Sequence, residues 1–146
     1  MKKLIVGLSA LIVVVAISAC SGEGDADTNR FPIEVTDSRI EAGELIYADN
    51  CASCHGPVNG PTVLDSAPVH GDAGHTWHHP DRLLFQWVLD RPPLAVTMPA
   101  FRDKLTEEEV IDALAFIKSH WLPEIQDRQA EGSAQYEDQI IEFGVE

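Results

Sequence analysis

The sequence lacks two patterns that define other fold classes. No stretch alternates polar and apolar residues at the two-residue period of a β-strand, and no segment repeats at a fixed interval. A sheet protein, a solenoid and a propeller are therefore disfavoured. The 146 residues suffice for one ordinary domain, and the sequence predicts that this domain is all-α.

Basic residues are also few. The chain has 10 Lys and Arg against 24 Asp and Glu, which gives a formal net charge of −14. Such a charge disfavours binding to nucleic acid or to anionic lipid surfaces. It favours protein partners with basic docking surfaces, although solubility alone would also explain it.

Cysteine occurs only three times. Cys20 follows two lysines and the apolar run Leu4 to Ile17, which is shorter than a membrane-spanning helix. The segment that ends at Cys20 resembles the lipobox of bacterial lipoproteins, which implies a signal peptide over residues 1–19 and lipidation of Cys20. The chain is then exported and anchored to a membrane on its periplasmic or extracytoplasmic face. An uncleaved anchor helix is the alternative.

The rest of the chain divides by composition. Residues 20–37 are rich in Gly, Asp, Glu and Thr and predict a flexible acidic linker. Residues 38–123 carry the helical patterns of the domain, and residues 124–146 predict a loosely held polar tail. Ser38 with Glu41, and Thr106 with Glu109, predict capping boxes at the starts of two helices. A further helix is expected between Pro80-Asp81 and Arg91-Pro92-Pro93.

Cys51, Cys54 and His55 form a C-x-x-C-H motif, the signature of covalent haem attachment. Two thiols three positions apart on one turn can reach the two vinyl groups at one porphyrin edge, and the adjacent imidazole then lies under the iron. A dithiol redox site has no need for the histidine, and a zinc site needs more ligands than these. The motif predicts one covalent haem c.

The chain has only two methionines, and Met1 would be lost with the signal peptide. A methionine as second axial ligand must therefore be Met98, in a loop stiffened by Pro99. A thioether ligand raises the reduction potential and closes the iron to small molecules. This favours electron transfer over catalysis.

These residues resemble the class I, single-haem cytochromes c over roughly residues 38–123. The resemblance implies a small fold of three to five helices around one haem, with Cys51 and Cys54 as thioether attachments. It also implies His55 and Met98 as iron ligands. In that family the first and last helices cross at positions like Gly43 and Phe116. Arg91-Pro92-Pro93 departs from the glycine-containing turn of many relatives.

A cluster of histidines has no assigned role in this pattern: His70, His75, His78 and His79. The simplest interpretation is that Trp77 and one or two of these histidines, such as His78 and His79, line the haem and hydrogen-bond its propionates. Arg82 could also pair with a propionate. The cluster could instead bind a metal such as copper, or supply a second histidine ligand to the haem iron.

The sequence therefore predicts an electron carrier that transfers single electrons between redox protein partners and has no catalytic residues. The alternatives are a haem enzyme or sensor of gas or peroxide with an open sixth site, the haem subunit of a larger oxidoreductase, and a metal-binding module.

Overall fold

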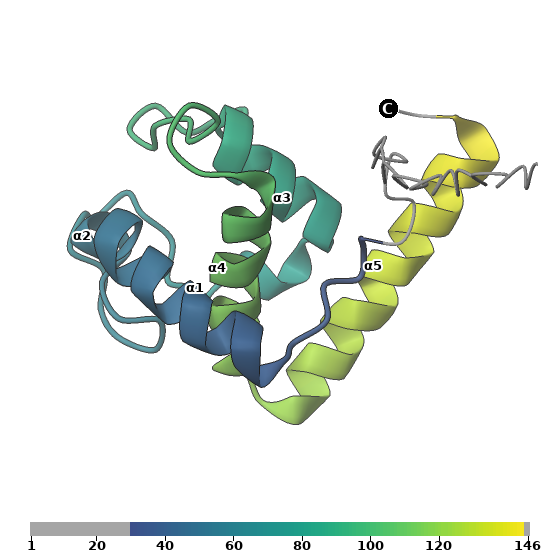
Figure 1. Cartoon of the computed structure of the whole chain (residues 1–146), viewed down its shortest axis with the longest axis horizontal. Helices are drawn as coiled ribbons and strands as arrows, with labels where there is room; N and C mark the ends of the chain where they lie inside the picture. The colour runs from purple at the N-terminus through teal and green to yellow at the C-terminus, as the bar shows by residue number, and fades with distance from the viewer. Residues whose placement is uncertain (1–29, 145–146) are drawn as a thin grey trace, which may run out of the picture.

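The computed structural model describes residues 30–144 and is helical (Figure 1). No strand occurs among these residues, which confirms the all-α prediction. Five α-helices and one 3-10 helix follow in order along this part of the chain: α1 (Asp37–Asn50), α2 (Ala52–His55), η1 (Thr76–His78), α3 (Asp81–Asp90), α4 (Glu107–Ser119) and α5 (Pro123–Phe143).

The crossing of α1 and α4 is the most extensive helix contact of the described fold. A Cβ atom on Gly43 would lie 2.0 Å from the carbonyl oxygen of Asp112 and 2.8 Å from Cβ of Phe116, so only glycine permits this approach. The rings of Tyr47 and Phe116 then pack with their centroids 5.4 Å apart. Arg39 of α1 closes the contact by an ion pair of 2.7 Å with Asp112. The crossing implied by the resemblance is confirmed.

The two predicted capping boxes have different outcomes. At α4, the Thr106 hydroxyl accepts from the Glu109 amide, and the Glu109 carboxylate accepts from the Thr106 amide at 2.7 Å. At α1, the prediction of a cap at Ser38 is wrong, because the helix begins at Asp37 and Thr36 is its N-cap. The Thr36 side chain accepts from the Arg39 amide, and its extended backbone provides the non-helical geometry that a cap requires.

The prediction of a loosely held tail after residue 123 is wrong. Residues 123–143 form α5, a helix of 21 residues that begins with Pro123 at its first position. Its packed face is polar and consists of Gln129, Ser133 and Glu137, which recur every fourth residue and are all buried. The four-residue spacing fits one face of a helix, but the three residues are polar, so a pattern of apolar residues does not reveal it.

A buried polar cluster joins α5 to the rest of the domain. Asp81, at the start of α3, is fully buried and pairs with Lys118 of α4 at 2.6 Å. Its carboxylate also accepts from the Ile33 amide at 2.7 Å and from Gln129 at 2.8 Å, and its backbone amide donates to Ser133 at 3.0 Å. One aspartate thus connects the segment before α1, α3, α4 and α5.

Gly132 lies in the interior of α5 without a packing reason, because a Cβ atom there would meet nothing within 4 Å. Glycine in a helix is less favourable than alanine by about 1 kcal/mol. We therefore expect Gly132→Ala to raise the free energy of unfolding by about 0.5–1 kcal/mol, measured by urea denaturation of the haem-loaded protein. A decrease would contradict this prediction.

The predicted signal peptide, the lipidation site Cys20 and most of the predicted linker lie outside the described residues. Within residues 30–144, no helix has the length and apolar composition needed to cross a membrane.

Candidate functional site

The haem-attachment motif forms the end of a continuous helical segment. Cys51 is the C-cap of α1 and the N-cap of α2, and its carbonyl accepts from the amides of Cys54 at 3.1 Å and His55 at 2.9 Å. Both thiols and the imidazole therefore lie on one turn, as the motif predicts. The chain then reverses at Gly56, which has φ +66°, and a Cβ there would lie 2.2 Å from the Pro61 carbonyl oxygen.

The orientation of His55 is set by a carbonyl. Its Nδ1 lies 3.0 Å from the carbonyl oxygen of Pro68, and because a carbonyl only accepts, Nδ1 carries the proton and donates. Nε2 is then the nitrogen with a free lone pair, which is the form in which a histidine binds a metal. His55 is 8 % exposed, so this tautomer is held in a buried position.

Two further residues support this turn. The Tyr47 hydroxyl donates to the Gly56 carbonyl at 3.0 Å, and burial, followed by the neighbouring Cys51, raises the pKa of Tyr47 to about 12. The Cys54 carbonyl accepts from the amides of Val63 and Leu64. The sequence offered no signal for these contacts or for Pro68, since any residue has a carbonyl and the partners are separated along the chain.

The surroundings of the Cys51 thiol do not suit dithiol redox chemistry. Both cysteines are free and partly buried. Burial raises the pKa of the Cys51 thiol to about 11, and Cys54 beside it acts in the same direction. A redox-active C-x-x-C pair needs a lowered pKa, because the thiolate is the nucleophile. This electrostatic setting therefore disfavours the thioredoxin-like alternative.

Met98 lies in the loop between α3 and α4 and packs partly buried against the core. Residues on both sides of Met98 bond to other parts of the protein. Before Met98, the Thr97 hydroxyl lies 3.3 Å from the Ser66 hydroxyl, and Ser66 belongs to the same segment as Pro68, the partner of His55. After Met98, the Phe101 amide donates to carbonyl groups at the end of α3. The loop that carries Met98 thus contacts the segment that orients His55.

His70 packs against the proposed iron ligand itself. Its ring stacks on that of His55 with centroids 4.0 Å apart and an interplanar angle of 24°. His70 therefore lies beside the His55 ring, and this stacked arrangement gives no support to His70 as a second iron ligand. Burial, followed by His55, lowers the pKa of His70 to about 3, and its Nδ1 lies 3.3 Å from the Tyr47 hydroxyl.

The remaining histidines gather at η1. The ring of His75 lies 4.7 Å from His78 and 4.9 Å from His79, and His79 lies 4.7 Å from Trp87. Across residues 30–144, however, no three His, Cys, Asp or Glu side chains are arranged to hold a metal ion. The metal-binding alternative gains no support from this geometry.

The residues predicted to contact propionates are engaged with the protein. Trp77 donates through Nε1 to the Asp72 carbonyl at 3.1 Å. The Arg82 guanidinium pairs with Glu137 of α5, a partner that the sequence did not indicate. A role of Trp77, His78, His79 or Arg82 toward propionates stays a prediction.

His79 should contribute to the pH dependence of stability. Burial, followed by His75 and His78, lowers its pKa below the usual 6.5, so the folded state binds fewer protons than the unfolded state. Stability should therefore fall as the pH drops below about 6.5. We expect His79→Gln to reduce the loss in urea midpoint between pH 7 and pH 5. An equal loss in both proteins would contradict this.

The donor set and its surroundings fit a haem c: two thiols on one turn, an imidazole with Nε2 available, and a thioether on a neighbouring loop. The helical fold and this site define a class I c-type cytochrome. A model of the family "cytochrome c oxidase, cbb3-type, subunit III" matches residues 38–117, and the chain belongs to this family. Membership implies haem c binding and a role in electron transfer.

A curated relative gives a second comparison. One of the subunits of nicotinate dehydrogenase from Pseudomonas putida is 30% identical over 115 residues, which cover 70% of this chain. The same region is 9% of the relative, so the chain spans a small part of that protein's length. No solved structure matches the chain.

Proposed function

We propose that this protein is an exported, membrane-anchored electron carrier with one covalent haem, attached at Cys51 and Cys54 and ligated by His55 and Met98. The observation that carries the proposal is the Nδ1–Pro68 hydrogen bond of 3.0 Å, which leaves Nε2 of His55 available on the turn that bears both thiols. The haem supplies an iron that accepts and releases one electron.

The chain's own residues would keep this exchange free of other chemistry. Pro68 fixes the His55 tautomer, and the contacts at Thr97 and Phe101 hold the Met98 loop on both sides. If His55 and Met98 both bind the iron, the protein's own side chains would keep small molecules from it, and little reorganisation would accompany electron transfer. These features support a carrier over a gas or peroxide sensor.

Met98→Ala tests the ligation. In the ferric protein we expect a methionine-sulfur charge-transfer band that is lost in this variant, together with a lower reduction potential, because a thioether favours the ferrous state. The matched control is Leu94→Ala in the same loop, where the leucine is 95% exposed and its loss should leave the band unchanged. A high-spin wild-type spectrum with ready CO binding would instead indicate an open sixth site.

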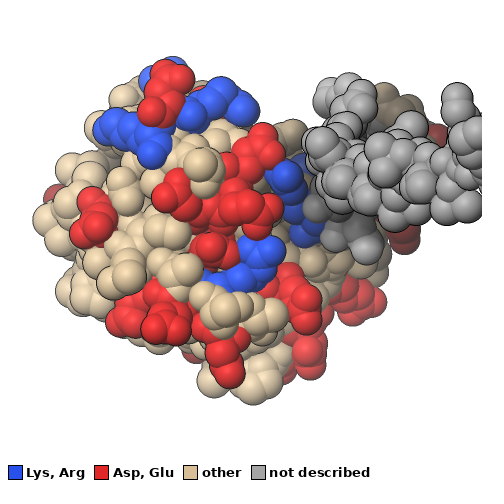
Figure 2. Space-filling view, viewed as in Figure 1, with Lys and Arg blue, Asp and Glu red and all other residues tan. Residues whose placement is uncertain are grey.

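The surface favours basic redox partners. Figure 2 shows acidic side chains over much of the face viewed. Several acidic residues belong to the crossing of α1 and α4, where Arg39 is paired with Glu108 and Asp112. Electron transfer to a basic partner should therefore slow as ionic strength rises, because salt screens the attraction that steers the encounter.

A second candidate is the haem subunit of a larger oxidoreductase. It is favoured by the resemblance to part of a much longer dehydrogenase subunit. Purification of the tagged protein from its native membrane separates the two: a stoichiometric dehydrogenase or oxidase partner favours the subunit, and an isolated cytochrome favours the carrier. The mass of the mature N-terminus in the same sample tests lipidation of Cys20.

A further inference from the structure

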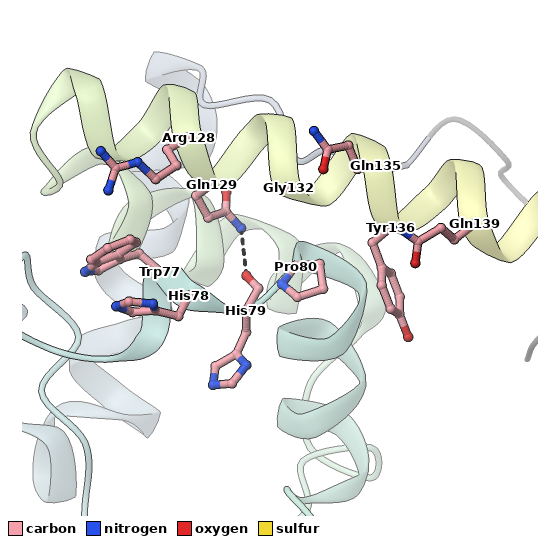
Figure 3. Close-up of a pocket in the computed structure, with 10 residues that line it drawn as sticks. All are labelled: Trp77, His78, His79, Pro80, Arg128, Gln129, Gly132, Gln135, Tyr136 and Gln139. Atoms are coloured by element: carbon pink, nitrogen blue, oxygen red, sulfur yellow. Dashed lines mark hydrogen bonds between the residues drawn. The ribbon is translucent and has the colours of Figure 1, made fainter.

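A groove lies between η1 and α5 (Figure 3). Its volume is about 300 Å³, the lower end of the range for ligand sites and room for roughly ten water molecules. Trp77 and His78 line it from η1, and Arg128, Gly132 and Tyr136 line it from α5. Neither of the attachment cysteines, Cys51 and Cys54, nor the proposed iron ligands His55 and Met98 lines it.

The charge of the groove differs from that of the chain. None of its lining residues is Asp or Glu, although the chain has 24 of them. Arg128 carries the only permanent charge in the lining, and its guanidinium lies 5.7 Å from the centre of the Trp77 ring. Among the described residues it has no carboxylate partner. The groove therefore offers an unpaired cation to an anion.

The walls are fixed by the protein. Trp77 is held by its bond to Asp72 and by the ring of His78, whose centroid is 3.7 Å away. Gln129 of α5 donates to the His79 carbonyl at 3.1 Å and joins the two walls (Figure 3). A fixed groove binds without the entropic cost of ordering its walls.

The far end of the groove is aromatic. Arg128 and Tyr136 are eight residues apart, which is about 12 Å along the helix axis. Within residues 30–144, the Tyr136 hydroxyl and the Gln139 amide have no protein hydrogen-bond partner, so both are available to a ligand. The groove thus presents a cation at one end and a flat ring with polar groups at the other.

Gly132 lies on the wall of the groove between these ends (Figure 3). Glycine disfavours a helix, and no neighbouring atom forces it here, because a Cβ would meet nothing within 4 Å. Any larger side chain at this position would project into the open volume. The glycine therefore keeps the groove open at the cost of helix stability.

From this geometry we propose that the groove binds a small, flat organic carboxylate. The carboxylate forms a bidentate pair with Arg128, whose planar fork matches it, and the ring of the ligand lies toward Tyr136. The site would make the cytochrome a receptor for a small acid in addition to its role in electron transfer.

Benzoate is the probe. Isothermal titration of benzoate into the haem-loaded protein should show saturable binding at one site. Arg128→Gln should weaken the affinity at least tenfold, as should the replacement of benzoate by the neutral benzamide. Gly132→Leu should abolish binding, because the leucine occupies the groove. The matched control is Arg102→Gln. It removes an arginine between α3 and α4 that does not line the groove, so the affinity should be unchanged.

Absence of saturable benzoate binding overturns the proposal, and so does an affinity that Arg128→Gln and Gly132→Leu leave unchanged. The visible spectrum and melting temperature of each variant confirm that it is folded with its haem. These readouts separate this proposal from the haem assignment: a normal cytochrome spectrum without benzoate binding overturns the groove alone.

Discussion

Lys118→Met is expected to lower the free energy of unfolding by about 3–5 kcal/mol, the usual cost of leaving a buried charge without its partner. Asp81 is fully buried and Lys118 is 2% exposed, so water cannot replace the lost ammonium group. The same lysine also donates to the Ile33 carbonyl at 3.2 Å, and this bond is lost as well. Burial lowers the pKa of Lys118, and the paired Asp81 opposes this shift.

The double variant Asp81→Asn with Lys118→Met separates the charge from the packing. It leaves no unpaired ion, so it should be more stable than Lys118→Met alone. The control is Arg102→Met, which breaks an ion pair with Asp90 in which both side chains are 54% exposed. Because water solvates both partners, this variant should leave stability almost unchanged. Equal losses for Lys118→Met and Arg102→Met in chemical denaturation would contradict the prediction.

The parts of the fold that the sequence predicts are local. The attachment motif occupies five consecutive residues, the capping box at Thr106 spans four, and α3 lies between two proline signals. Each depends on neighbours that the sequence itself displays. The support of His55 by Pro68 and the pairing of Asp81 with Lys118 depend on residues 13 and 37 positions apart, which no local pattern specifies.

The last helix shows why composition misleads at a polar interface. Its buried face consists of Gln129, Ser133 and Glu137, residues that usually lie in water. They are buried because α3 presents partners to them: Asp81 to the first two, and Arg82 to Glu137. A helix that packs through hydrogen bonds has no apolar stripe, so it is recognised only when its partner is placed beside it.

Removal of the haem is expected to leave the domain largely unfolded. The apolar face of a porphyrin, roughly 400 Å², is worth on the order of 10 kcal/mol gross at ~25 cal/mol/Å², which matches the whole stability of an ordinary domain. Several apolar side chains of the described chain pack only partly buried around the core, among them Trp87, Val88 and Met98. A domain of this size has a modest core of its own, and no disulfide joins its described cysteines.

Cys51→Ser with Cys54→Ser should therefore abolish covalent attachment and with it the cooperative unfolding transition. The measurements are haem retention after acid extraction and circular dichroism during urea denaturation. Ser53→Ala is the control, because it changes the same turn and leaves both thiols and His55 in place. A haem-free double variant that unfolds as cooperatively as the loaded protein would contradict the prediction. It would show that the helix crossing at Gly43 and the Asp81 cluster suffice to hold the fold without the cofactor.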